Sequence, residues 1–195
     1  IELPNSSSIW IADKNTIGVN EPVKLTWTSD QNITFEKIIT LDDNYLFSVN
    51  QRVINNSGLS FDLYPYGLSK RQGIPEMQNF FILHEGPLSI TDGVLEEYDY
   101  DDLKDDKKIK HSSVGGWIGM TDKYWQTAII PNQNEPVQQT YSYSFVDNID
   151  NFQTDIVGER IAISNNASIS HNFKIFAGPK IVNIIDKYME EYGFD

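Results

Sequence analysis

Apolar and polar residues alternate along most of this chain, in short runs that turn residues separate. Val23, Leu25 and Trp27 share one face of a predicted strand, because successive side chains on a strand point to opposite faces. Pro65 interrupts a later run and favours an edge or a bulge there, and residues 55–58 are a strong turn signal. Further strand-like runs occupy residues 33–40, 45–54, 59–68, 80–83, 88–90, 141–146, 152–157 and 170–177. Strands at roughly ten-residue spacing predict an all-β sandwich.

The densest apolar stretch predicts a hairpin at the centre of that sandwich. Residues 117–120 and 124–130 read as two strands, and Gly115 before them suits a turn or a close backbone approach. Two tryptophans, Trp117 and Trp125, lie in this stretch beside one tyrosine and three isoleucines. So much apolar surface is typical of a core, so we expect both tryptophans to be buried.

Residues 96–110 break the alternation, because aspartate and lysine crowd the segment and few apolar residues remain. We interpret this stretch as a solvated loop. The spacing of Asp99, Asp101 and Asp105 faintly suggests a calcium loop. However, the positions that should hold glycine and glutamate hold Lys104 and Lys110. We therefore expect no metal there. A kink and a further loop are expected at residues 84–87 and 132–136.

The end of the chain changes to a helical period. Pro179 suits a first helical turn and Gly193 suits a C-cap, so we predict a helix over residues 179–192. Its apolar stripe consists of Ile181, Ile184, Ile185, Tyr188, Met189 and Tyr192. Its polar face consists of Lys180, Asn183, Lys187, Glu190 and Glu191. We expect the stripe to pack on the sandwich, and residues 1–8 at the other end to be loose.

Length, charge and composition exclude several classes of protein. A chain of 195 residues fits a single all-β domain spanning residues 1–195. The absence of cysteine excludes disulfides, thiolate zinc sites and thiol catalysis. A net charge of −13 argues against binding of nucleic acid and against direct binding to an anionic lipid surface. No apolar run approaches the 18 residues of a membrane span, and the first residues do not resemble a signal peptide.

The sequence gives little support for a catalytic function. The three histidines are His84, His111 and His171, and neighbours such as His84 and Glu85 point to opposite faces of a strand. We expect His111, which closes the charged segment, to be solvated. Asp42 and Asp43 lie in a predicted turn, where hydrogen bonds to the backbone account for them. Phosphate-loop, nucleophile-elbow and zinc-protease motifs are absent from the sequence, so we expect no enzyme, no cofactor and no catalytic residue.

Five strings of residues resemble one family, the large periplasmic domain of the bacterial membrane protein insertase YidC. They are residues 41–49, 65–68, 83–87, 116–125 and 176–180, spread over most of the chain in the family's order. The resemblance implies a twisted β-supersandwich, similar to sugar mutarotases, with a C-terminal helix. It also implies a domain at the periplasmic face of the inner membrane. Residues 132–168 carry no string of this family.

The resemblance implies a scaffold or interaction module that assists insertion and folding of inner-membrane proteins. Its expected partners are the remainder of the insertase, components of the Sec translocon and, through the full-length protein, nascent membrane proteins. The polar face of the predicted helix is the candidate surface for these partners. The alternative is a carbohydrate- or peptide-binding module that uses Tyr64, Tyr66 and Tyr141 as stacking platforms in a cleft. Apolar segments of about 20 residues on either side of this chain would favour the first hypothesis.

Overall fold

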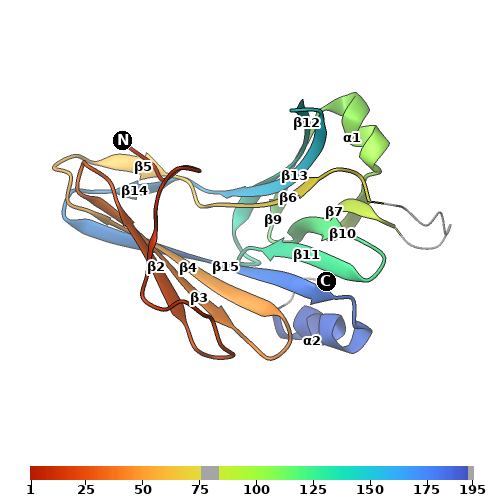
Figure 1. Ribbon diagram of the computed structural model, residues 1–195, viewed down its shortest axis with the longest axis horizontal. Coiled ribbons are helices and arrows are strands. Elements are labelled where there is room, and N and C mark those ends of the chain that lie inside the picture. The colour runs from red at the N-terminus through yellow and green to blue at the C-terminus, as the bar shows by residue number, and fades with distance from the viewer. Residues whose placement is uncertain (76–83, 193–195) are drawn as a thin grey trace. The chain divides into compact units, whose positions relative to one another are not determined.

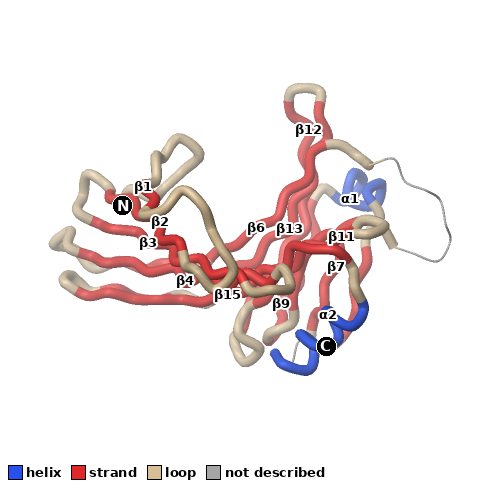
Figure 2. Tube along the Cα trace, turned by 60° about the horizontal axis from the view of Figure 1, so that its bottom comes forward, coloured by secondary structure: helices blue, strands red, loops and turns tan. Residues whose placement is uncertain are grey.

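Strands dominate the computed structural model, which describes residues 1–75 and 84–192 (Figures 1 and 2). The chain forms two compact units. The first comprises Ile1–Pro65 and Arg160–Lys174, and the second comprises Tyr66–Glu159 and Ile175–Asp195. The first change of unit therefore falls at Pro65, where the sequence predicts an interruption. The prediction of an all-β fold of antiparallel sheets with a C-terminal helix is confirmed. The prediction of one domain over the whole chain stays a prediction.

The first unit is built on an antiparallel sheet in the order β1, β2, β3, β4, followed by the first part of β15. Its strands are β1 (Ile11–Ala12), β2 (Val23–Thr28), β3 (Ile33–Leu41), β4 (Leu46–Asn55) and β15 (Ala167–Pro179). A second, two-stranded sheet pairs β5 (Phe61–Leu63) with β14 (Ile161–Ile163). Ile33, Phe35, Val53 and Ile163 form a buried apolar cluster in this unit. In the turn before β4, the Asp42 carboxylate accepts the backbone N–H groups of Asn44 and Leu46, as predicted.

The second unit is a sandwich of two antiparallel sheets. One sheet has the order β6, β13, β12, β9, and the other has the order β11, β10, β7, β8 beside the last part of β15. Their strands are β6 (Tyr66–Gln72), β7 (Gly86–Thr91), β8 (Val94–Glu97), β9 (Lys108–Val114), β10 (Trp117–Thr121), β11 (Trp125–Ile130), β12 (Pro136–Val146) and β13 (Ile149–Gly158). The fully buried Gln139 on β12 crosses between the layers and donates its amide N–H groups to the carbonyls of Ile90 and Trp117. Hydrogen bonds, in addition to apolar packing, therefore hold the two sheets together.

The central hairpin forms as predicted, from β10 and β11, with Gly119 opposite Ala128. Gly115 has a φ of 68°, in the left-handed region that favours glycine. Trp117 is 9% exposed, but Trp125 is 58% exposed, so the prediction that both are buried is wrong for Trp125. The reason is position along the ladder: Trp117 pairs with β7 inside the sheet, whereas Trp125 begins β11 at the turn.

The acidic segment, residues 96–110, is not the solvated loop that the sequence predicts, so that prediction is wrong. It contains the end of β8, the helix α1 (Tyr100–Asp106) and the start of β9. Tyr100 and Leu103, three residues apart on α1, are both buried, and Asp99 and Asp102 form a capping box at its start. Burial raises the pKa of Tyr100 to about 12. α1 is mostly charged, and the burial of Tyr100 and Leu103 packs it against the sandwich.

His111 also departs from its expectation. It lies in β9 rather than in a loop, and its Nε2 atom is 2.8 Å from the Tyr98 hydroxyl oxygen. His111 is therefore held by a neighbouring aromatic side chain and is not simply solvated.

The C-terminal helix is confirmed, but it begins later than predicted. α2 spans Val182–Tyr192, because Pro179 ends β15 and does not open the helix. The backbone N–H of Lys180 donates to the Tyr124 carbonyl oxygen over 2.8 Å, which keeps the chain extended for another residue. Within the described residues, no helix is long and apolar enough to cross a bilayer.

Three predictions remain: a loose segment at residues 1–8, a strand at residues 80–83 and a helix cap at Gly193. Residues 1–8 contain no strand, yet the backbone N–H of Glu2 donates to the Gln31 side chain over 2.8 Å. The strand expected at residues 80–83 and the cap expected at Gly193 lie outside the described residues.

The two hairpin tryptophans provide a matched test of this fold. Trp117→Ala should lower the free energy of unfolding by about 3–5 kcal/mol, because it empties a buried site. Trp125→Ala should change that free energy by no more than about 0.5 kcal/mol, as is usual for exposed positions. Urea denaturation of both variants measures the difference, and equal losses would contradict the burial described here.

Candidate functional site

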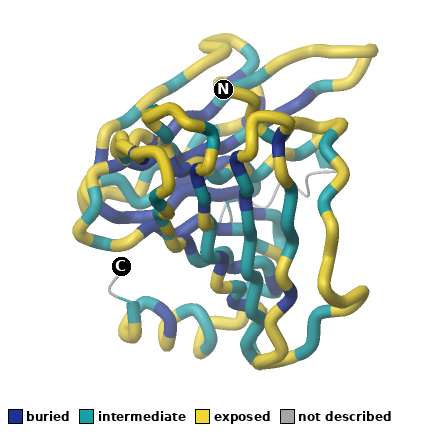
Figure 3. The backbone as a smooth tube through the Cα atoms, turned by 90° about the vertical axis from the view of Figure 1, so that its left-hand side faces the viewer, coloured by how far each residue is buried: buried dark blue, intermediate teal, exposed yellow. Residues whose placement is uncertain are grey.

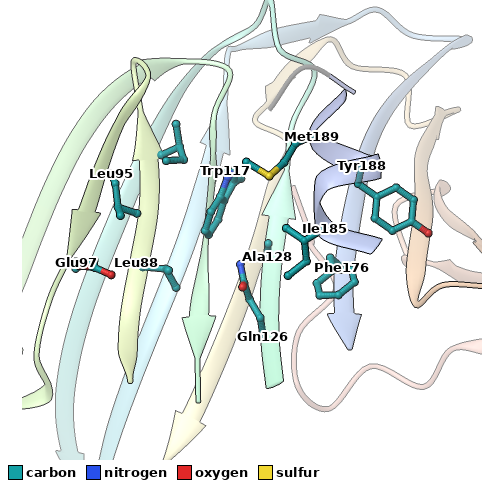
Figure 4. Close-up of a pocket in the computed structure, with 11 residues that line it drawn as sticks. Leu88, Leu95, Glu97, Trp117, Gln126, Ala128, Phe176, Ile185, Tyr188 and Met189 are labelled. Atoms are coloured by element: carbon teal, nitrogen blue, oxygen red, sulfur yellow. The ribbon is translucent and has the colours of Figure 1, made fainter. Parts of the chain in front are cut away.

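An apolar groove lies beside α2, on the face of the β11–β10–β7–β8 sheet that points away from the other sheet (Figure 4). We call it the α2 groove. Its cavity has a volume of about 280 Å³. The helix side consists of Ile185, Tyr188 and Met189, with Phe176 of β15 beneath them. The sheet side consists of Leu88, Ile90, Leu95, Glu97, Trp117, Gln126 and Ala128. All of these residues belong to the second unit.

The groove exists because small residues leave the sheet surface low at its centre. In the strand register, Leu88 of β7 lies opposite Gly119 of β10, and Gly119 lies opposite Ala128 of β11. Gly119 has no side chain, and a Cβ atom there would collide with the Thr127 carbonyl oxygen. A glycine and an alanine side by side therefore form a shallow floor between larger neighbours. The groove was not predicted from the sequence, although the small residues at the centre of the hairpin were the available signal.

Tyr188 holds α2 against the sheet. It is almost fully buried, and its ring packs edge-on to Phe176 with 6.3 Å between the centroids. Tyr192, one turn further on, stacks on Tyr188 at 5.9 Å. Ile185 and Met189 are half-buried, and the predicted stripe is therefore only partly covered. Figure 3 shows the same pattern, with exposed and intermediate residues along most of the helix.

The candidate partner surface lies mostly where the sequence predicts. Asn183, Lys187, Glu190 and Glu191 are all exposed on the side of α2 away from the sheet. Lys180 is different, because it is half-buried in the segment before the helix. Burial lowers the pKa of the Lys180 ammonium, and the nearby carboxylates of Glu85 and Asp122 partly oppose this. Four of the five residues therefore form one open face.

The three tyrosines proposed as cleft platforms do not act together. Tyr141 has no exposed surface and packs against Tyr98 with 4.7 Å between ring centroids, so its interpretation as a stacking platform is wrong. Tyr66 is exposed on β6, where its hydroxyl oxygen accepts a hydrogen bond from Gln153. Tyr64 is exposed in the first unit. Tyr141 lies in the middle of β12, where its side chain packs in the core and is not available to stack on a ligand.

The histidines have structural contacts. His84 Nε2 lies 3.1 Å from the Pro87 carbonyl oxygen, and the ring of His171 packs on Phe173 at 4.6 Å. In the part of the chain that the structure describes, no three His, Asp or Glu side chains are grouped so as to hold a metal ion.

Comparison with known proteins links the whole chain to one family. The model of the YidC periplasmic domain matches residues 1–195. The chain is 37% identical over 194 residues to the membrane protein insertase YidC of Rickettsia canadensis, covering 99% of this chain and 35% of that protein. It is 39% identical over 197 residues to the YidC of Pelagibacter ubique, covering 100% of this chain and 34% of that protein. The chain thus spans about a third of the length of the curated relatives it matches.

A solved structure supports the fold alone. A TPR-domain containing protein from Parabacteroides distasonis aligns with a TM-score of 0.50 at 8% sequence identity. The alignment covers 91% of this chain and 36% of that chain. At this identity the likeness extends to the arrangement of the backbone and not to a shared activity.

The packing of α2 on the sheet can be tested with a matched pair of substitutions. Ile185→Asp should lower the free energy of unfolding by about 2 kcal/mol or more, because it places a carboxylate against the apolar groove. Val182→Asp, at a position that is 68% exposed, should change it by no more than about 0.5 kcal/mol. Thermal or urea denaturation of the 195-residue chain measures both variants. An Ile185→Asp variant as stable as the original chain would show that α2 is not docked in solution.

Proposed function

The chain belongs to the family of YidC periplasmic domains, and on that premise we propose that it serves as the periplasmic interaction domain of a membrane protein insertase. The match over residues 1–195 is the observation that carries this proposal. The curated relatives are named membrane protein insertases, and each is about three times as long as the region it shares with this chain. The domain assists insertion and folding of inner-membrane proteins as a scaffold, and the rest of the insertase holds the membrane-spanning part.

The exposed face of α2 is the surface we propose for its partners. Exposed charges contribute only about 0–1 kcal/mol each to folding, so Lys187, Glu190 and Glu191 are free to serve a contact instead. The partners are the remainder of the insertase and components of the Sec translocon. Nascent membrane proteins reach the domain through the full-length protein.

The charge of the domain supports this choice of partner. A net charge of −13 repels nucleic acid and anionic lipid headgroups at close range, so a protein surface is the better match. The alternative of a carbohydrate-binding cleft has lost support, because the buried Tyr141 cannot stack on a sugar ring.

Charge reversal on α2 tests the proposal. Lys187→Glu combined with Glu191→Lys keeps the net charge and should lower the free energy of unfolding by no more than about 1 kcal/mol. Both side chains are exposed, and the contact of the Lys187 ammonium with the Tyr188 ring, 5.9 Å from its centroid, is worth about 0.5–1 kcal/mol at an exposed site. In a full-length insertase that contains this domain, the same pair should weaken crosslinking to a Sec component and slow insertion of a membrane protein. Lys14→Glu, at an exposed position in the first unit, is the control and should have neither effect. Crosslinking and insertion at the original level in the double variant would rule out this face as the contact.

A further inference from the structure

The described residues of this chain leave the α2 groove unfilled, and apolar side chains stand exposed along it. Leu95, on the sheet side, is 52% exposed, and Ile185 and Met189, on the helix side, are only partly covered. Met189 extends from α2 toward Trp117 across the groove, while Tyr188 points to the other side of the helix (Figure 4). Apolar side chains in this arrangement form a surface that another apolar side chain can cover.

The volume of the groove indicates how much it holds. A cavity of roughly 150 Å³ lined by aliphatic and aromatic side chains accommodates benzene. At about 280 Å³, the α2 groove therefore has room for two large apolar side chains. Helices that bind in grooves present such anchors at positions i and i+3 or i+4.

The width of the sheet beside α2 is suited to a second helix packed on its face, and less to a strand added at its edge. α2 lies over Phe176 and Ala128, on β15 and β11, and three more strands (β10, β7 and β8) continue the sheet beyond it. At about 4.8 Å per strand these add roughly 14 Å of sheet, and neighbouring helices pack about 8–10 Å apart. A second helix beside α2 would therefore lie over β10 and β7. A strand added to the edge of β8 would not reach Trp117 or Met189.

The negative charge along the groove favours an occupant with basic residues. Among the described residues that line it, Glu97 is the one charged residue, and none is lysine or arginine. Asp186 follows Ile185 on α2 and is exposed, on the same flank of the helix as Met189 by the 100° step between residues. Both rims of the groove thus carry a carboxylate, in a domain of net charge −13.

From these observations we propose that the α2 groove binds an amphipathic helix of a partner polypeptide, with two large apolar anchors and lysine or arginine residues beside them. This goes beyond the proposed function, because the groove and the open face of α2 point in different directions and use different residues. The apolar anchors occupy the space above Gly119 and Ala128, and the basic residues meet Glu97 and Asp186.

A designed peptide serves as the probe. It is a fluorescein-labelled peptide of two heptads, with Leu at the a and d positions, Lys at e and g, and Ala elsewhere. One matched peptide has Glu in place of Lys, and another has Pro at its centre, which breaks the helix. Fluorescence anisotropy with the 195-residue chain at physiological salt should show saturable binding of the Lys peptide. Its Kd should be at least about tenfold lower than those of the Glu and Pro peptides.

Two neighbouring residues of β8 provide the matched variants of the protein. Leu95 lies in the groove and Val94 points to the opposite face of the strand, and both are more than half exposed, so neither substitution should unfold the domain. Leu95→Asp should raise the Kd of the Lys peptide at least about tenfold, a loss of roughly 1.4 kcal/mol. Val94→Asp should change it less than about twofold. Glu97→Lys should remove the preference for the Lys peptide over the Glu peptide.

Several results would overturn the proposal. Absence of saturable binding, equal binding of the Lys and Glu peptides, or equal losses for Leu95→Asp and Val94→Asp would each do so. Binding of the Pro peptide as tightly as the Lys peptide would indicate an extended occupant instead of a helix. Binding of dodecyl maltoside that Leu95→Asp weakens, without binding of the Lys peptide, would indicate a lipid-like occupant. The charge-reversal experiment on α2 is independent of all these outcomes.

Discussion

The packing of Tyr188 on Phe176 is the contact on which the functional surfaces of this domain depend. α2 has only 11 residues, fewer than an isolated helix needs to be stable in water, and it has no acidic residue in its first turn and no basic residue in its last. Its stability must therefore come from packing on the sheet. A fully buried large side chain contributes about 1.5–3 kcal/mol and an aromatic pair about 0.5–1.5 kcal/mol more. Tyr188 is the residue of α2 that is fully buried. If it is lost, the polar face of the helix has no fixed orientation and the α2 groove has no second wall.

The sandwich beneath α2 provides a rigid support for that contact. Gln139 joins the two sheets by hydrogen bonds to the carbonyls of Ile90 and Trp117, and both of these residues also line the groove. Gly119 and Ala128 keep the sheet surface low enough for a groove to remain beside the helix. The same five-stranded surface thus holds α2 at one side and leaves apolar area open at the other. This division gives the domain two distinct surfaces, a charged helix face and an apolar groove with acidic rims.

Much of the fold followed from local pattern, whereas the errors arose where tertiary position decided the outcome. The hairpin at β10 and β11 and the amphipathic period of α2 were visible because each depends on residues close in sequence. The burial of Trp117 and the exposure of Trp125 could not be separated in this way, since Trp117 pairs with β7 inside the sheet and Trp125 begins its strand at a turn. α1 was missed because two apolar residues, Tyr100 and Leu103, outweigh a charged composition once they meet the sandwich. The groove was missed because it requires the register of three strands and the placement of a helix, which no single stretch of sequence contains.

Amide hydrogen exchange, followed residue by residue by NMR in the 195-residue chain, tests the docking of α2 most directly. If α2 is docked through Tyr188, amides in the second half of the helix should exchange at least about tenfold more slowly than in an unstructured peptide. Tyr188→Ala should abolish this protection while the amides of β10 and β11 keep theirs. Exchange of the α2 amides at the unstructured rate in the original chain, or undiminished protection in Tyr188→Ala, would show that Tyr188 does not hold α2 on the sheet.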